Sequence, residues 1–122
     1  MNRIMKKAFT LPTCKTCVRI FEELQPVAHG CEVIDIKSEG IAAEDLDRMA
    51  ELAGSYEAVF SRRAMKFRSM GLADQELKES DYRRLILEEY TFLKRPVFLF
   101  ADSVHAGSAK ASVSAAQAVM TA

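Results

Sequence analysis

Two of the three cysteines in this 122-residue chain, Cys14 and Cys17, are separated by only two residues. Such a C-x-x-C pair can perform thiol–disulfide exchange. One thiolate attacks a disulfide to form a mixed disulfide, and the second sulfur then attacks this mixed disulfide and releases the product. Two other interpretations stay open at this stage. The cysteines could be small packed residues of the core. They could also belong to a zinc site with His29 and Cys31, although that ligand spacing is unusual.

The residues around the pair predict a strand, a turn and a helix. Residues 5–11 are apolar at their centre and lead into Pro12, which is typical of a strand followed by a turn. An apolar stripe with helical spacing comes next, at Cys17, Ile20, Phe21 and Leu24. Cys14 should therefore lie just before a helix. There the unpaired backbone N–H groups and the helix dipole favour a thiolate.

The remaining periodicity predicts a mixed α/β fold in a single domain, 1–122. The expected elements are a strand at 31–36, helices at 42–52, 64–70 and 80–93, strands at 97–100 and 103–105, and a helix at 108–120. We expect Ser80 to cap the third of these helices, and Cys31 to lie in the core. The order is β-α-β, a helical insert at about 40–93, then β-β-α. This order is that of a thioredoxin-like fold with a mixed four-stranded sheet.

A proline opens the predicted strand at 97–100, in the dipeptide Arg95-Pro96. At this position a proline costs the sheet no ladder hydrogen bond. In thioredoxin-like folds a cis proline at this point lies beside the reactive cysteine. We therefore expect Pro96 to be cis and close to Cys14.

The charge composition argues against two classes of binding partner. The chain has 17 Lys+Arg and 17 Asp+Glu, so it lacks the excess positive charge on which direct nucleic-acid binding or membrane-surface binding usually rests. No apolar run approaches the roughly 20 residues of a membrane span, and the N-terminus does not have the pattern of a signal peptide. We expect a cytoplasmic protein with reduced thiols.

Four stretches carry a resemblance to a known family: AFTLPTCKTC, DIKSEGIAAEDLDRMAELAG, VFSRRAMKFRSMGL and LKRPVFLFADS. With them the chain resembles the glutaredoxin-coupled arsenate reductases and the Spx-type redox regulators over nearly its whole length. The resemblance implies that Cys14 is the reactive cysteine and Cys17 the second one. It also implies that Arg63 and Arg95 bind an anionic group, since the corresponding arginines help to hold the oxyanion in the arsenate reductases.

The chain departs from the arsenate reductases at three places. Thr-Leu-Pro at 10–12 replaces their usual His-Asn-Pro, and Val18 replaces the arginine after the cysteine motif, with Arg19 one place later. The arginine after the last strand is missing, and Lys110 is the only cation nearby. Because an oxyanion needs several fixed donors, these departures weaken the case for arsenate as the substrate.

The sequence therefore predicts a thiol–disulfide redox protein in which Cys14 attacks and Cys17 resolves, assisted by Arg63 and Arg95. We expect a monomer without bound cofactor or metal. Its partners would be a small oxyanion or disulfide substrate and an external thiol reductant, either glutathione with glutaredoxin or thioredoxin. One alternative is an Spx-like regulator whose cysteine pair switches binding to RNA polymerase. The other is a true glutathione/glutaredoxin-dependent arsenate reductase.

Overall fold

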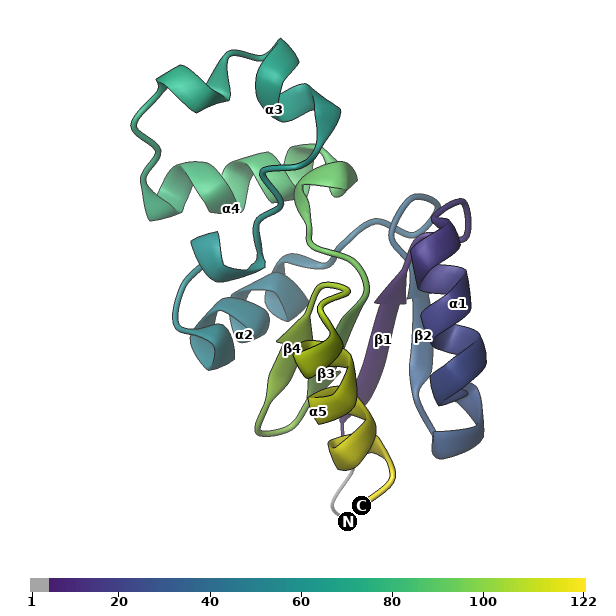
Figure 1. Ribbon diagram of the computed structural model, residues 1–122. Helices are drawn as coiled ribbons and strands as arrows, with labels where there is room; N and C mark the ends of the chain where they lie inside the picture. The colour runs from purple at the N-terminus through teal and green to yellow at the C-terminus, as the bar shows by residue number, and fades with distance from the viewer. Residues whose placement is uncertain (1–4) are drawn as a thin grey trace. The chain divides into compact units, whose positions relative to one another are not determined.

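The computed structural model describes residues 5–122 and divides them into two compact units (Figure 1). The first unit contains the chain up to Glu39 and again from Arg95 onward, and the second is Gly40–Lys94. No helix in the described part of the chain is long and apolar enough to cross a membrane. The elements of the first unit are β1 (Lys6–Thr10), α1 (Lys15–Leu24), β2 (Glu32–Asp35), β3 (Val97–Phe100), β4 (Val104–Ala106) and α5 (Lys110–Met120).

The four strands form one mixed sheet in the order β2-β1-β3-β4. The central strand β1 pairs in parallel with β2 and antiparallel with β3, and β4 adds antiparallel to the outer side of β3. A parallel β-α-β unit followed by an antiparallel hairpin and a helix is the thioredoxin-like arrangement. The structure confirms the fold class predicted from the order of the elements.

Helices α1 and α5 cover the same face of this sheet (Figure 1). Alternate residues of a strand point to opposite faces, so β1 directs Ala8 toward these helices and Phe9 to the other face. The phenyl rings of Phe21 on α1 and Phe98 on β3 lie 5.8 Å apart. The buried cluster between helices and sheet consists of Ala8, Ile20, Leu24, Cys31, Phe98, Phe100, Ala116 and Met120. Cys31 is thus a core residue, as predicted.

The second unit is helical and holds α2 (Ala43–Ala53), α3 (Met65–Ser69) and α4 (Glu79–Glu88). Phe60 is at its centre, with ring centroids 4.9 Å from Tyr82, 5.1 Å from Phe92 and 5.9 Å from Phe67. Polar contacts join α2 to α4, because the Asp47 carboxylate accepts a hydrogen bond of 2.8 Å from Arg83 Nε. This packing of aromatic rings explains why a largely polar insert folds compactly.

The predicted boundaries of α4 were wrong at both ends. Lys78, and not Ser80, is the N-cap, and its backbone N–H donates to the Asp81 carboxylate at 2.8 Å. The Asp81 carboxylate in the first turn thus stabilises a helix start two residues earlier than a cap at Ser80 would. The helix also ends well before residue 93, because Glu89 is extended and the 3-10 turn Tyr90–Phe92 follows. The last strand and helix start one and two residues later than predicted.

Candidate functional site

Cys14 occupies the N-cap position of α1, in extended backbone conformation and half-buried. Its backbone N–H donates to the Leu11 carbonyl at 2.9 Å, and its carbonyl accepts from the Val18 N–H at 3.1 Å. The first bond closes the turn after β1, and the second begins the helix. The sulfur therefore lies at a helix N-terminus, where backbone N–H groups have no partner within the helix.

The surroundings of Cys14 favour its thiolate. Burial raises its pKa, but hydrogen bonds from the Cys17 backbone N–H, the Cys17 thiol and the Thr16 N–H lower it, as does the positive charge of Arg95. Together the lowering contributions outweigh burial, and the pKa of Cys14 falls below its usual value. Since the thiolate is the nucleophilic form, Cys14 is the stronger candidate nucleophile of the pair.

Cys17 has the opposite environment. Its side chain is fully buried in the first turn of α1, and burial is the main cause that raises its pKa. The Cys14 charge and its hydrogen bond raise the Cys17 pKa further, whereas a backbone N–H of Leu11 and the Thr10 hydroxyl lower it in part. The two sulfurs are therefore unequal, because one favours the thiolate and the other keeps its proton.

Arg95 and Pro96 lie directly before β3, and the peptide bond between them is cis. Arg95 is half-buried and Pro96 is buried. The Arg95 charge acts on Cys14, so the structure brings these two predicted site residues together across a long stretch of sequence. Opposite charge stabilises a thiolate in this way whether or not an anionic ligand is also held.

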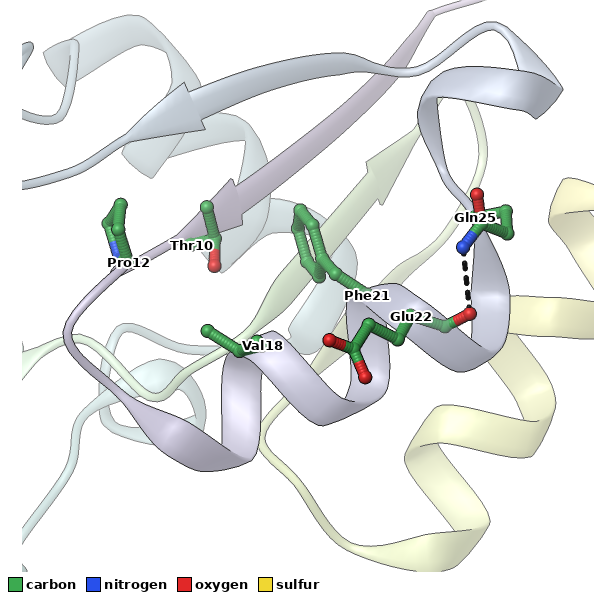
Figure 2. A pocket seen from close by; sticks show the side chains of 6 residues that line it. All are labelled: Thr10, Pro12, Val18, Phe21, Glu22 and Gln25. Atoms are coloured by element: carbon green, nitrogen blue, oxygen red, sulfur yellow. Dashed lines mark hydrogen bonds between the residues drawn. The ribbon is translucent and has the colours of Figure 1, made fainter.

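An open groove of about 320 Å³ runs along α1 beside the turn that joins β1 to α1 (Figure 2). The end of β1 and the turn after it contribute Thr10 and Pro12, and α1 contributes Val18, Phe21 and Glu22, with Gln25 at its C-cap. The wall is mostly apolar, and the Gln25 amide donates to the Glu22 carbonyl at 2.8 Å. Sequence reasoning had treated Thr10 only as a departure from the family pattern. Its two-residue spacing from Ala8 was the signal that it points toward α1.

Two other cations that the sequence analysis considered lie on exposed surfaces of the first unit. Arg19 pairs with Glu23 at 3.2 Å on the exposed side of α1, and Lys110 is exposed in the first turn of α5. Arg63 belongs to the second unit, where it is exposed. The role of Arg63 therefore stays a prediction.

The zinc interpretation fails on geometry. In the part of the chain that the structure describes, no three His, Cys, Asp or Glu side chains gather as metal ligands would. Cys31 faces the core cluster, and His29 Nδ1 lies 3.1 Å from the Gln25 carbonyl oxygen. Cys14 and Cys17 are therefore together, but neither His29 nor Cys31 joins them in a ligand set among the described residues.

The sheet topology, with a C-x-x-C at the start of α1 and a cis proline before β3, defines a thioredoxin-like protein. A profile of the ArsC family matches residues 9–116. The chain belongs to the ArsC family.

Comparison with solved structures extends this likeness. A possible arsenate reductase from Streptococcus mutans UA159 is 26% identical, with a TM-score of 0.69 over 84% of this chain and 88% of that one. The protein YffB (PA3664) is 24% identical, with a TM-score of 0.76 over 93% and 99% of the two chains. An ArsC-family-related protein from Bacteroides fragilis is 17% identical, with a TM-score of 0.78 over 94% and 99%. The last two show likeness of fold alone. No curated protein sequence matches the chain.

Proposed function

We propose that this protein reduces disulfides, with Cys14 as the nucleophile and Cys17 as the resolving cysteine. The observation that carries the proposal is the place of Cys14 at the N-cap of α1, where N–H donors and the Arg95 charge lower its pKa. Cys17 one turn later is within reach of a sulfur bound to Cys14, because the hydrogen bond between the two thiols already brings them together.

The reaction follows from the chemistry of the pair. The Cys14 thiolate attacks one sulfur of a substrate disulfide, breaks the S–S bond and releases the other half as a thiolate, which takes up a proton from water. Cys17 then loses its proton and attacks the Cys14 sulfur of the mixed disulfide, which releases the second half. The substrate gains two electrons and the cysteine pair becomes a disulfide.

Turnover requires a reductant outside the chain. We propose that glutathione with glutaredoxin, or thioredoxin, supplies the two electrons that reopen the Cys14–Cys17 disulfide. No bound cofactor is needed for this cycle, and a monomer contains all the groups that it uses.

A second candidate function is arsenate reduction, which the name of the Streptococcus mutans protein suggests. The action of the Arg95 charge on Cys14 supports this candidate, and Arg63 of the second unit would be the second arginine of the family pattern. Against this candidate, Arg19 is engaged with Glu23 and Lys110 is exposed, so neither replaces the donors missing from the family pattern. Each missing charge-assisted hydrogen bond costs roughly 1.5–3 kcal/mol. Two of them reduce catalysis by about two orders of magnitude or more.

Reductase assays of the wild type and of the Cys14→Ser and Cys17→Ser variants test the proposal. With a model disulfide and either thiol system, the wild type should turn over and Cys14→Ser should be inactive. Efficient turnover of sub-millimolar arsenate would instead make arsenate reduction the main function. Turnover of neither substrate, with redox-dependent binding to RNA polymerase, would identify an Spx-like regulator.

A further inference from the structure

The resolving step requires the buried Cys17 thiol to lose its proton. The Cys17 side chain is fully buried, and burial disfavours its thiolate. Its sulfur must nevertheless lose a proton before it can attack the mixed disulfide on Cys14. A group that stabilises negative charge at this buried sulfur is therefore required.

Thr10 has the position to be that group. It is the last residue of β1, paired in register with Asp35 of β2, and its carbonyl accepts from the Ile36 N–H at 3.0 Å. Its side chain is only 8% exposed and shares the α1-facing side of the strand with Ala8. The Thr10 hydroxyl bonds to the Cys17 sulfur, and Figure 2 shows the Thr10 side chain directed toward α1.

We propose that the Thr10 hydroxyl is the hydrogen-bond donor that stabilises the Cys17 thiolate during the resolving step. The inference rests on the proposed disulfide reduction and adds a residue to it. The donor is held by the strand and not by a flexible loop, so its hydroxyl needs no rearrangement when the charge forms.

The arrangement makes activation of Cys17 depend on substrate. While both cysteines are reduced, a negative charge on Cys14 opposes a second one on Cys17. When Cys14 attacks a disulfide, its charge leaves with the departing thiolate, and Cys14 becomes half of a neutral mixed disulfide. The Thr10 hydroxyl and the Leu11 backbone N–H then remain as donors to Cys17. Cys17 is thereby favoured as a nucleophile only after the first step.

Thr10 also offers a route for the proton. It lines the open groove of Figure 2, whereas Cys17 itself is closed to solvent. Its hydroxyl can accept the Cys17 proton and pass its own proton to solvent water in the groove, after which the hydroxyl donates to the thiolate. The second thiolate leaves as the Cys14–Cys17 bond forms.

Stopped-flow reaction with one equivalent of 5,5′-dithiobis(2-nitrobenzoate) separates the two steps. Attack by Cys14 releases the first thionitrobenzoate, and attack by Cys17 releases the second. Thr10→Val removes the hydroxyl while keeping a β-branched strand residue, and Thr10→Ser restores a hydroxyl. Thr13→Val makes the same change at an exposed threonine of the adjoining turn.

A hydrogen bond to a charged group changes an ionisation equilibrium roughly ten- to a hundredfold. The greater reactivity of a more basic thiolate returns about half of this on a logarithmic scale. In Thr10→Val the second phase should therefore be about three- to tenfold slower at about pH 6, with its pH profile displaced upward and its first phase unchanged. At alkaline pH the variant should equal or exceed the wild type. Thr10→Ser and Thr13→Val should follow the wild-type profile.

An unshifted profile for the second phase in Thr10→Val would overturn the inference. So would an equal slowing of both phases at every pH, which would assign Thr10 a structural role only. Absence of the first phase in the wild type would overturn the proposed function itself, and the inference with it.

Discussion

Replacing Arg95 should make Cys14 less reactive, but less so than removing the Cys17 thiol. Both groups lower the pKa of Cys14, and the hydrogen bond from the Cys17 thiol contributes more than the Arg95 charge. Cys14 is half-buried, so water screens the arginine. This order of contributions is specific to the geometry of the loop and can be measured.

The expected magnitudes follow from the two kinds of contact. Coupling between partly exposed charges is worth about 0.2–1 kcal/mol, or roughly a 1.4- to 5-fold change in the thiolate fraction. A hydrogen bond to a charged acceptor is worth about 1.5–3 kcal/mol. Because a thiol is a weak donor, the lower end applies, which is about tenfold. At about pH 6, Arg95→Met should thus reduce the thiolate fraction about 1.4- to 5-fold and Cys17→Ala about tenfold.

Iodoacetamide alkylation between about pH 5 and pH 9, followed peptide by peptide with mass spectrometry, measures these changes. Cys14 should be labelled first in the wild type, and its profile should move to higher pH in both variants. Arg19→Met is the matched control, because Arg19 is on the same helix but pairs with Glu23. A larger effect of Arg95→Met than of Cys17→Ala, or first labelling of Cys31, would refute the reasoning.

Three further outcomes are expected. Mild oxidation should form an intramolecular Cys14–Cys17 disulfide, seen as the loss of two mass units, which Cys14→Ser abolishes; a dominant bridge to the third cysteine would contradict the site. Added arsenate or sulfate should protect Cys14 from alkylation, and Arg63→Met should weaken this protection if Arg63 binds the anion as the family pattern implies; unchanged protection would show that Arg63 is a surface charge. Hydrogen bonding to Lys66 lowers the pKa of Glu89, so its contribution to the unfolding free energy should be present above about pH 4.5 and lost as the pH falls further. Urea unfolding should therefore show Glu89→Gln less stable than wild type at neutral pH, with a gap that closes in acid; a gap independent of pH would show that the carboxylate charge is irrelevant.

The local features of this protein are determined within short stretches of its sequence. The apolar spacing from Cys17 to Leu24 specifies α1, and the turn at Pro12 specifies where α1 begins, so the N-cap position of Cys14 was predictable. The order of strands and helices likewise specified a thioredoxin-like fold, because few topologies accommodate a parallel β-α-β unit followed by a hairpin. These predictions rest on residues only a few positions apart.

Boundaries that depend on competition between neighbouring groups were less predictable. Ser80 is a good capping residue by type, but the Asp81 carboxylate accepts a hydrogen bond from the Lys78 N–H, and α4 therefore begins at Glu79. At the other end the 3-10 turn after Glu89 interrupts a pattern that is otherwise helical. In both places the helix boundary depends on which hydrogen bonds form, and the apolar periodicity of the sequence does not predict this.

Only the tertiary structure decided which groups act on the two sulfurs. Arg95 influences Cys14 because β3 lies next to β1, although the residues are far apart in sequence. Thr10 reaches Cys17 because the pleat of β1 directs it toward the helix packed on that face. A pKa depends on burial and on every donor and charge nearby. Those are established only when strands and helices from distant parts of the chain pack together.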